Sequence, residues 1–128
     1  MLFRSSVLEG VSFSLRETLE VCRKMGKEIH TIRVSGGGAK SALWRQIQAD
    51  IFDASVVTME IEEGPAAGAA ILAAVGCGEY DSVEEAAKKL VKVVDTVKPD
   101  SELVKKYEKR YKIFRQIYPN LKFLYPML

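Results

Sequence analysis

One short run of this sequence has residue types and spacing that suit phosphate chemistry. It is Gly36-Gly37-Gly38-Ala39-Lys40-Ser41. Glycine has no side chain, so a ligand can approach the backbone closely and the chain can take a path that other residues avoid. If a helix begins here, its unpaired N–H groups and the positive end of its dipole favour an anion such as phosphate. Lys40 and Ser41 add a cation and a hydroxyl at the same place.

Two well-known phosphate-binding motifs are not matched by this run. A Walker A loop is G-x-x-x-x-G-K-[ST], but here Ala39 precedes Lys40. The dinucleotide fingerprint G-x-G-x-x-G also fails, because Ser41 stands where its third glycine belongs. A glycine triplet alone is a weak signal, so a structural turn and a ligand-binding loop stay open as interpretations.

The flanking residues predict a strand before the turn and a helix after it. Residues 29–34 alternate between apolar and polar types, as in a short strand, and apolar residues from Leu43 to Ile51 recur at steps of four. A second strand is expected over 54–59. Pro65 then suits the first turn of a helix made largely of alanine, whose small side chains permit close packing.

Further amphipathic helices are predicted on either side of this central part. The first carries apolar residues from Leu8 to Cys22 and ends at Gly26, and another is expected to begin at a capping box at Ser82 and end before Pro99. The residues expected to form their buried stripes are Leu8, Val11, Leu15, Leu19 and Cys22 in the first, and Val83, Ala87, Leu90 and Val94 in the second.

The last helix is expected to start at a cap formed by Asp100 or Ser101. Its predicted stripe is aromatic and apolar, and residues 119–128 are expected to form a tail. The stripe consists of Leu103, Tyr107, Tyr111, Phe114 and Tyr118. In total the pattern predicts an α/β class with few strands, two by this count, and about five helices.

Composition excludes several classes of protein. The net charge is +2, from 19 basic and 17 acidic residues, which gives no bias towards nucleic acid or an anionic membrane. The apolar runs are well short of the roughly 20 residues that span a bilayer. Cys22 and Cys77 lie far apart without metal-ligand spacing, so we expect neither a disulfide framework nor a zinc site, and a cytoplasmic setting.

Three segments together resemble the FGGY family of carbohydrate kinases. Residues 32–51, IRVSGGGAKSALWRQIQADI, look like the adenosine motif of that family. Residues 6–15, SVLEGVSFSL, resemble the helix that precedes it, and residues 63–76, EGPAAGAAILAAVG, are similar to its Gly-Pro-Ala helix. The Lys98-Pro99-Asp100 turn, and the Tyr118-Pro119 pair where the last helix is expected to end, resemble the corresponding segments of family members that act on xylulose.

The resemblance implies a fold and a place within a longer protein. Residues 1–128 would be a single partial domain, the C-terminal portion of the second actin-like (ribonuclease H-like) ATPase domain of a two-domain sugar kinase. Such kinases transfer the γ-phosphoryl group of ATP to a sugar, here a ketopentose such as xylulose. We expect an N-terminal part to precede Met1, and we expect the isolated chain to show no turnover.

The resemblance also implies roles for individual residues. Gly36, Gly37 and Gly38 would approach the α-phosphate and ribose of the nucleotide, Ser41 would lie beside the adenine or ribose, and Lys40 belongs to the same site. Gly64 and Gly68 would allow tight helix packing behind it. The catalytic base, the main Mg²⁺ ligands and the sugar-binding residues would precede this segment, so no catalytic and no metal-binding residue is assigned here.

Several other residues invite a functional hypothesis, and for each a plainer one is preferred. Trp44 is expected in the core rather than stacked on adenine, and His30 is expected at the surface. Glu60, Glu62 and Glu63 are explained by the following helix dipole rather than by a metal. The basic residues of the last helix are expected to be solvated rather than to bind RNA; they are Lys105, Lys106, Lys109, Arg110, Lys112 and Arg115.

Two alternatives to the kinase remain at this stage. One is a stand-alone, non-catalytic module that binds a nucleotide or a partner protein. The other is RNA binding by the basic last helix, which predicts a steep salt dependence. If the glycine turn were buried away from any cleft, the nucleotide interpretation would fail.

Overall fold

The computed structural model describes residues 2–60 and 64–127, without the side chains of Leu2 and Arg4. The described part contains five α-helices and three strands, which confirms the expected α/β class. The helices are α1 Leu2–Lys24, α2 Ala42–Phe52, α3 Gly64–Gly76, α4 Val83–Leu90 and α5 Ser101–Leu121. The strands are β1 Thr31–Val34, β2 Ser55–Met59 and β3 Val93–Val97, and two 3₁₀ segments are η1 Gly37–Lys40 and η2 Lys122–Met127.

The strands form one mixed sheet with β2 in the middle. β1 runs parallel to β2, with Thr31 opposite Ser55, and α2 provides the crossover between them. β3 runs antiparallel to β2, with Val56 opposite Val97 and an irregularity between Thr58 and Met59. The carboxyl ends of the two parallel strands therefore lie at the same edge of the sheet, next to the glycine turn.

β3 corrects the predicted course of the chain after Ser82. The sequence predicted one helix continuing through Val94, whereas α4 ends at Leu90 and Val94 is 65% exposed. Val93, Val94, Thr96 and Val97 are β-branched, a type that fits a pleated strand better than a helix. The free edge of β2 supplies the backbone partners, and Glu60 N extends the pairing by donating to Lys92 O at 2.9 Å.

The C-terminal tail was also predicted wrongly. α5 continues through Pro119 to Leu121, and η2 follows it. Proline removes one backbone donor from a helix, but this turn is exposed, so water can take the place of the missing bond. Asn120 Nδ2 donates to Gln116 O at 2.7 Å across the same turn.

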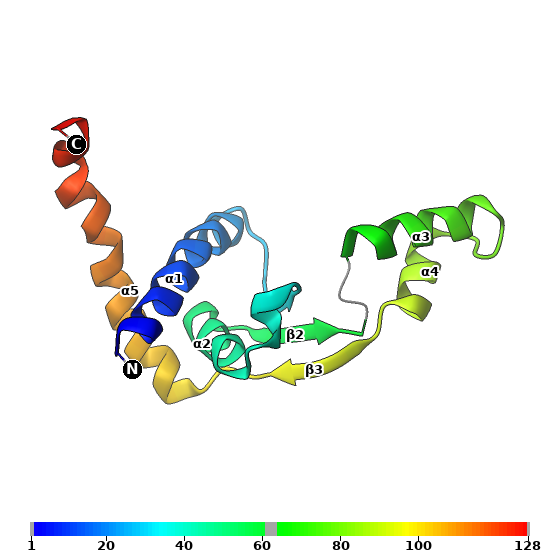
Figure 1. Ribbon diagram of the computed structural model, residues 1–128, viewed down its shortest axis with the longest axis horizontal. Coiled ribbons are helices and arrows are strands. Elements are labelled where there is room, and N and C mark those ends of the chain that lie inside the picture. The colour runs from blue at the N-terminus through cyan, green and yellow to red at the C-terminus, as the bar shows by residue number, and fades with distance from the viewer. Residues whose placement is uncertain (1, 61–63, 128) are drawn as a thin grey trace.

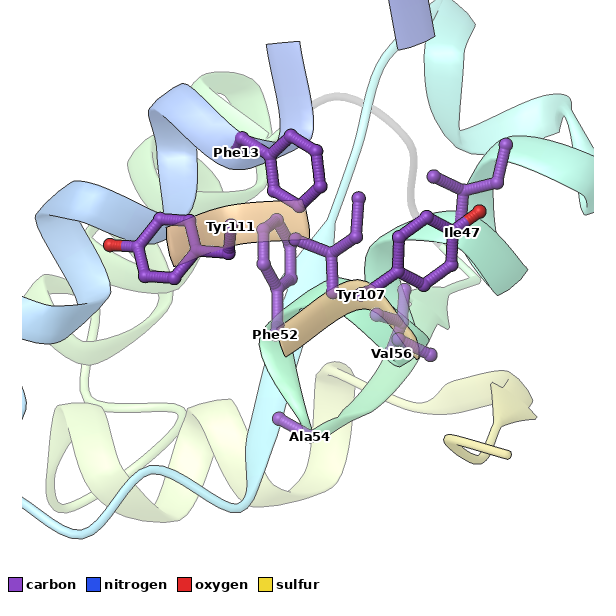
Figure 2. Packing of buried hydrophobic residues seen from close by; sticks show 9 residues of the cluster. Phe13, Ile47, Phe52, Ala54, Val56, Tyr107 and Tyr111 are labelled. Atoms are coloured by element: carbon purple, nitrogen blue, oxygen red, sulfur yellow. The ribbon is translucent and has the colours of Figure 1, made fainter. Parts of the chain in front are cut away.

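The core lies where α1, α2, β2 and α5 meet, as Figure 2 shows. Ile51 and Val56 are fully buried, and the ring of Phe13 stacks on Tyr111 with centroids 5.9 Å apart. The predicted aromatic stripe of α5 is buried at Tyr107 and Tyr111, as expected. It is not buried at Tyr118, which is 59% exposed. The helices α1, α2 and α5 thus form one body with the sheet (Figure 1).

The buried face of α1 coincides only in part with the predicted one, since Leu8 and Leu19 of the predicted stripe pack against the core but Val11 and Leu15 do not. Ser12, Phe13 and Arg16 are buried, whereas Val11 and Leu15 are 42% and 47% exposed. Both faces of this helix carry apolar residues, so periodicity alone does not select one. The predicted end of the helix is confirmed, because Gly26 has a φ of 80° and Lys27 N donates to Cys22 O in a Schellman-type closure.

Capping residues fix the starts of two other helices, as predicted. Ser82 Oγ accepts a hydrogen bond from Glu85 N at the start of α4. The Asp100 side chain accepts from Glu102 N and Leu103 N at the start of α5. These bonds satisfy backbone donors that have no partner within their own helix.

α3 and α4 pack on each other and lie at the far end of the β2–β3 pair from the other helices (Figure 1). Among the described residues of α3 only Ile71 is buried, and Leu72 is 64% exposed. A helix that is apolar on all sides is normally buried. Within the described part of the chain, α3 lacks the surroundings that its composition requires.

Both cysteines are free thiols. In the part of the chain that the structure describes, no helix combines the length and the apolar character needed to cross a bilayer.

Candidate functional site

The glycine turn lies beside a cleft of about 330 Å³, which we call the strand-end cleft. This volume is within the range of small-molecule sites. In open α/β sheets, ligands bind outside the carboxyl ends of parallel strands, which is where this cleft lies. Its lining residues are Val34, Ser35, Gly36, Ala39, Lys40, Arg45, Thr58, Met59, Glu60 and Val94.

The structure brings two of the five predicted nucleotide-binding residues to this cleft. Gly36 and Lys40 line it, while Gly37, Gly38 and Ser41 belong to the same turn without lining it. Gly36 has φ 81° and ψ −173°, a backbone conformation essentially restricted to glycine. The turn is therefore at a cleft, and its first glycine is required by the backbone path.

Gly38 is explained by packing. A Cβ on Gly38 would overlap the Trp44 ring, with Cε3 only 2.6 Å away and Cζ3 closer still. By contrast, a Cβ on Gly36 or Gly37 would meet no atom within 4 Å. The third glycine thus admits the indole ring, while the first two leave open space above the backbone.

The predicted core position of Trp44 is confirmed. Its ring packs against the core cluster, and its Nε1 donates to Ser12 Oγ at 3.2 Å. Ser12 is fully buried and its hydroxyl donates to Leu8 O at 2.8 Å. The predicted apolar stripe of this helix did not include Ser12, and nothing in the local pattern indicated its role as partner of the indole.

Ser41 begins α2. Its Oγ accepts a hydrogen bond from Trp44 N at 3.3 Å, so it is the N-cap of the helix. A serine hydroxyl has further acceptor and donor capacity. The capping role is therefore compatible with a ligand contact.

Arg45 connects the turn to the sheet, a role that the sequence did not reveal. Its Nη1 donates to Ala39 O at 2.5 Å, and its Nη2 donates to Asp95 Oδ2 at 2.8 Å. The Arg45 side chain is 16% exposed. Because Asp95 belongs to the unpredicted β3, no local pattern could have identified this pair.

The tight packing predicted at Gly64 and Gly68 is not seen within the described residues. A Cβ on either would meet no atom within 4 Å, so within the described residues nothing packs closely on them. Both line a second hollow of about 280 Å³ that shares Val34, Ser35 and Met59 with the strand-end cleft. The start of α3 therefore borders the same region as the glycine turn.

The acidic run before α3 lies mostly outside the described residues, which include Glu60 but not Glu62 and Glu63. Glu60 lines the strand-end cleft. Across residues 2–60 and 64–127, no group of three or more His, Cys, Asp or Glu side chains is arranged to hold a metal ion.

The basic face of α5 is solvated and largely ion-paired. Arg110 Nη1 lies 3.0 Å from Glu9 Oε2, and Arg115 Nε lies 3.1 Å from Glu17 Oε1, which joins α5 to α1. Lys105 pairs with Glu102 within α5. These contacts agree with the solvated-face prediction. His30 is also at the surface, as predicted, with its side chain 83% exposed.

The family to which this chain belongs is shown by a match to a known family model. Residues 2–77 match the model of the FGGY family of carbohydrate kinases, C-terminal domain. The chain belongs to this family. The match covers α1, the glycine turn and α3, the three segments that carried the resemblance, so the FGGY prediction is confirmed.

Relatives and solved structures agree with the FGGY assignment. The xylulose kinase of Bacillus subtilis is 42% identical over 120 residues, which are 94% of this chain and 24% of that protein. The ligand-bound xylulose kinase of Lactobacillus acidophilus matches with a TM-score of 0.85 at 26% identity, over 91% of this chain and 24% of that one.

A second structural neighbour is the glycerol kinase of Plasmodium falciparum with ADP, at a TM-score of 0.76 and 25% identity, over 91% of this chain and 23% of that one. This chain thus spans about a quarter of the length of the curated relatives that it matches. Its fold is that of the sugar kinases, the class for which the resemblance implied an actin-like ATPase domain.

Proposed function

We propose that this segment binds the adenosine part of ATP in an FGGY sugar kinase that phosphorylates a ketopentose. The reaction best supported by the relatives is conversion of D-xylulose to xylulose 5-phosphate by a xylulokinase. The observation that carries the nucleotide role is the glycine turn at the strand-end cleft, where Gly36 needs its glycine-only backbone. A structural neighbour of this segment is a kinase described with ADP.

In this proposal the open backbone at Gly36 and Gly37 lets the α-phosphate and ribose approach. A Cβ at either glycine would meet no atom within 4 Å, so the space above them suits a ligand. Lys40 supplies a cation at the same cleft, and Ser41 and Gly38 complete the turn. ATP supplies the γ-phosphoryl group that is transferred, and Mg²⁺ would be held mainly by residues outside this chain.

Catalysis and sugar binding belong to the remainder of the kinase in this proposal. Phosphoryl transfer needs a base for the attacking hydroxyl and groups that hold the β- and γ-phosphates. Residues 1–128 would then be one partial domain, and the isolated chain would not turn over. Its exposed apolar surfaces on α1 and α3 would be covered in the whole kinase and would favour self-association when they are not.

A cytoplasmic setting belongs to the same proposal. Both cysteines are free thiols, which is typical of proteins from reducing compartments.

The test uses the full-length kinase that contains this segment. ADP titrated into it by calorimetry and turnover measured with D-xylulose and MgATP should both be positive. Lys40→Met should weaken ADP binding about fivefold, since it removes one cation from the cleft. Lys105→Met removes a cation on α5 that is also exposed and should leave ADP binding unchanged.

Two outcomes would contradict the proposal. If the wild-type kinase does not bind ADP, or if Lys40→Met and Lys105→Met behave alike, the strand-end cleft is not the nucleotide site. If turnover is faster with another sugar than with D-xylulose, the substrate part of the proposal fails while the nucleotide part stands.

A further inference from the structure

We propose that Arg45 is a positioning residue that holds the glycine turn against β3 and thereby sets the affinity of the site for nucleotide. This inference rests on the proposed nucleotide-binding function.

The geometry joins three elements through one planar group. Arg45 projects from the first turn of α2, its Nη1 donates to the carbonyl of Ala39 in η1, and its Nη2 donates to Asp95 of β3. The carboxylate of Asp95 is itself oriented, because its Oδ1 accepts a hydrogen bond from Thr96 N at 2.8 Å. The turn is therefore connected to the strand on the far side of the cleft through the guanidinium.

The backbone hydrogen bonds that close the turn are local. They run from Ala39 N to Gly36 O and from Ser41 N to Gly38 O, each at 3.1 Å. The Trp44 ring packs on Gly38, and among the described residues no atom lies within 4 Å of a Cβ built on Gly36 or Gly37. Three consecutive glycines have much conformational freedom to lose. Holding the Ala39 carbonyl fixes the turn before a ligand arrives, which reduces the ordering cost of binding.

An arginine is required for this connection. The guanidinium offers several donors in a rigid plane, so it can reach a carbonyl and a carboxylate at once, whereas a lysine presents a single point charge. The low exposure of Arg45 also limits screening of its pair with Asp95 by solvent. Arg45→Lys should keep the charge at the cleft and lose one of the two connections.

The experiment compares four variants of the full-length kinase: Arg45→Lys, Asp95→Asn, the double variant, and Lys105→Gln as control. Asparagine keeps an oxygen for Thr96 N but loses the charge that pairs with Arg45. Lys105→Gln removes an ion pair on α5 that is remote from the turn. The measurements are ADP affinity by calorimetry, KM for MgATP and for D-xylulose, and hydrogen exchange of residues 36–41 without nucleotide.

We expect Arg45→Lys to weaken ADP binding about tenfold and Asp95→Asn about threefold, and the double variant to be no weaker than Arg45→Lys because the residues act as one unit. KM for MgATP should rise in parallel while KM for D-xylulose stays within about twofold. Exchange of the turn amides should be faster in both single variants and unchanged in Lys105→Gln.

Three results would overturn the inference: unchanged ADP affinity in Arg45→Lys, additive losses in the double variant, or an equal rise of both KM values, which indicates a general structural role. Each assumes that the wild-type kinase binds ADP. Failure of the wild type to bind would instead contradict the proposed function.

Discussion

The indole ring of Trp44 occupies the space where Gly38 would carry a side chain. A Cβ on Gly38 would lie 2.6 Å from Cε3 of that ring. The ring is held on its other side by the hydrogen bond from Nε1 to Ser12 Oγ and by the core around Phe13. The glycine turn is thereby attached to α1 through Trp44, so the shape of the candidate site depends on core packing.

Gly38→Ala should destabilise the kinase domain, because the ring of Trp44 cannot move away without disturbing the core. Overpacking of this kind lowers the free energy of unfolding by about 1–3 kcal/mol. Urea denaturation of the full-length kinase measures the change. The matched control is Gly37→Ala, one residue earlier, where the added methyl meets open space and should change stability by less than about 0.5 kcal/mol. Equal losses in the two variants would contradict the packing explanation.

Asp50 should make stability depend on pH. It is 1% exposed, and burial raises its pKa above the ordinary value of 3.8, although the hydrogen bonds from Asp100 N and Gln46 Nε2 act in the opposite direction. The ionised form is therefore less favoured in the folded than in the unfolded protein. Asp50 therefore contributes its full stabilisation at pH values below its unfolded-state pKa of about 3.8, where it is protonated. This contribution is lost as the pH rises through the higher pKa that Asp50 has in the folded protein.

Asp50→Asn removes this titration, and its Oδ1 can still accept the two hydrogen bonds. The unfolding free energy of Asp50→Asn relative to wild type should therefore increase as pH is raised from 4 to 7. Urea denaturation at a series of pH values follows the difference. A difference that stays constant, or that decreases with pH, would show that the pKa of Asp50 is not raised by folding.

Arg16 should contribute more to stability than the exposed cations near it. Its side chain is 10% exposed, Nη2 lies 2.6 Å from Glu108 Oε2, and the guanidinium lies 4.1 Å from the centre of the Tyr111 ring. Arg16→Met leaves Glu108 with only its longer contact to Lys112, and it also removes the pair between Arg16 and Glu20. Because Glu108 is 40% exposed, we expect a loss of about 2 kcal/mol rather than the larger loss of a fully buried pair.

The control for Arg16 is Lys112, whose Nζ lies 3.9 Å from the same Glu108 and is well exposed. Lys112→Met should lower the unfolding free energy by less than about 0.5 kcal/mol, and most of that should disappear at high salt. Chemical denaturation at two salt concentrations distinguishes the variants. Similar losses for both would show that burial of Arg16 adds nothing to its ion pairs.

Much of the local structure follows from the sequence. The strand before Ser35, the turn, the cap at Ser41 and the cap at Asp100 depend on residues within about four positions of one another. The hydrogen bond from Gln46 Nε2 to Asp50 Oδ1, at 2.9 Å, likewise joins two residues four positions apart on one helix. Family membership also followed from the sequence, because the three FGGY segments keep their order and spacing.

Only the tertiary structure decided how these elements are used. Residues 93–97 became a strand because the free edge of β2 offered backbone partners, although helical spacing continued to Val94. α1 has apolar residues on two faces, and contact with α2 and α5 selected the face with Phe13. The pairs Trp44 with Gly38 and Arg45 with Asp95 join segments brought together by the fold. Hydrogen bonds within a turn are fixed by neighbours in the chain, whereas burial and long-range pairing depend on which surface lies opposite.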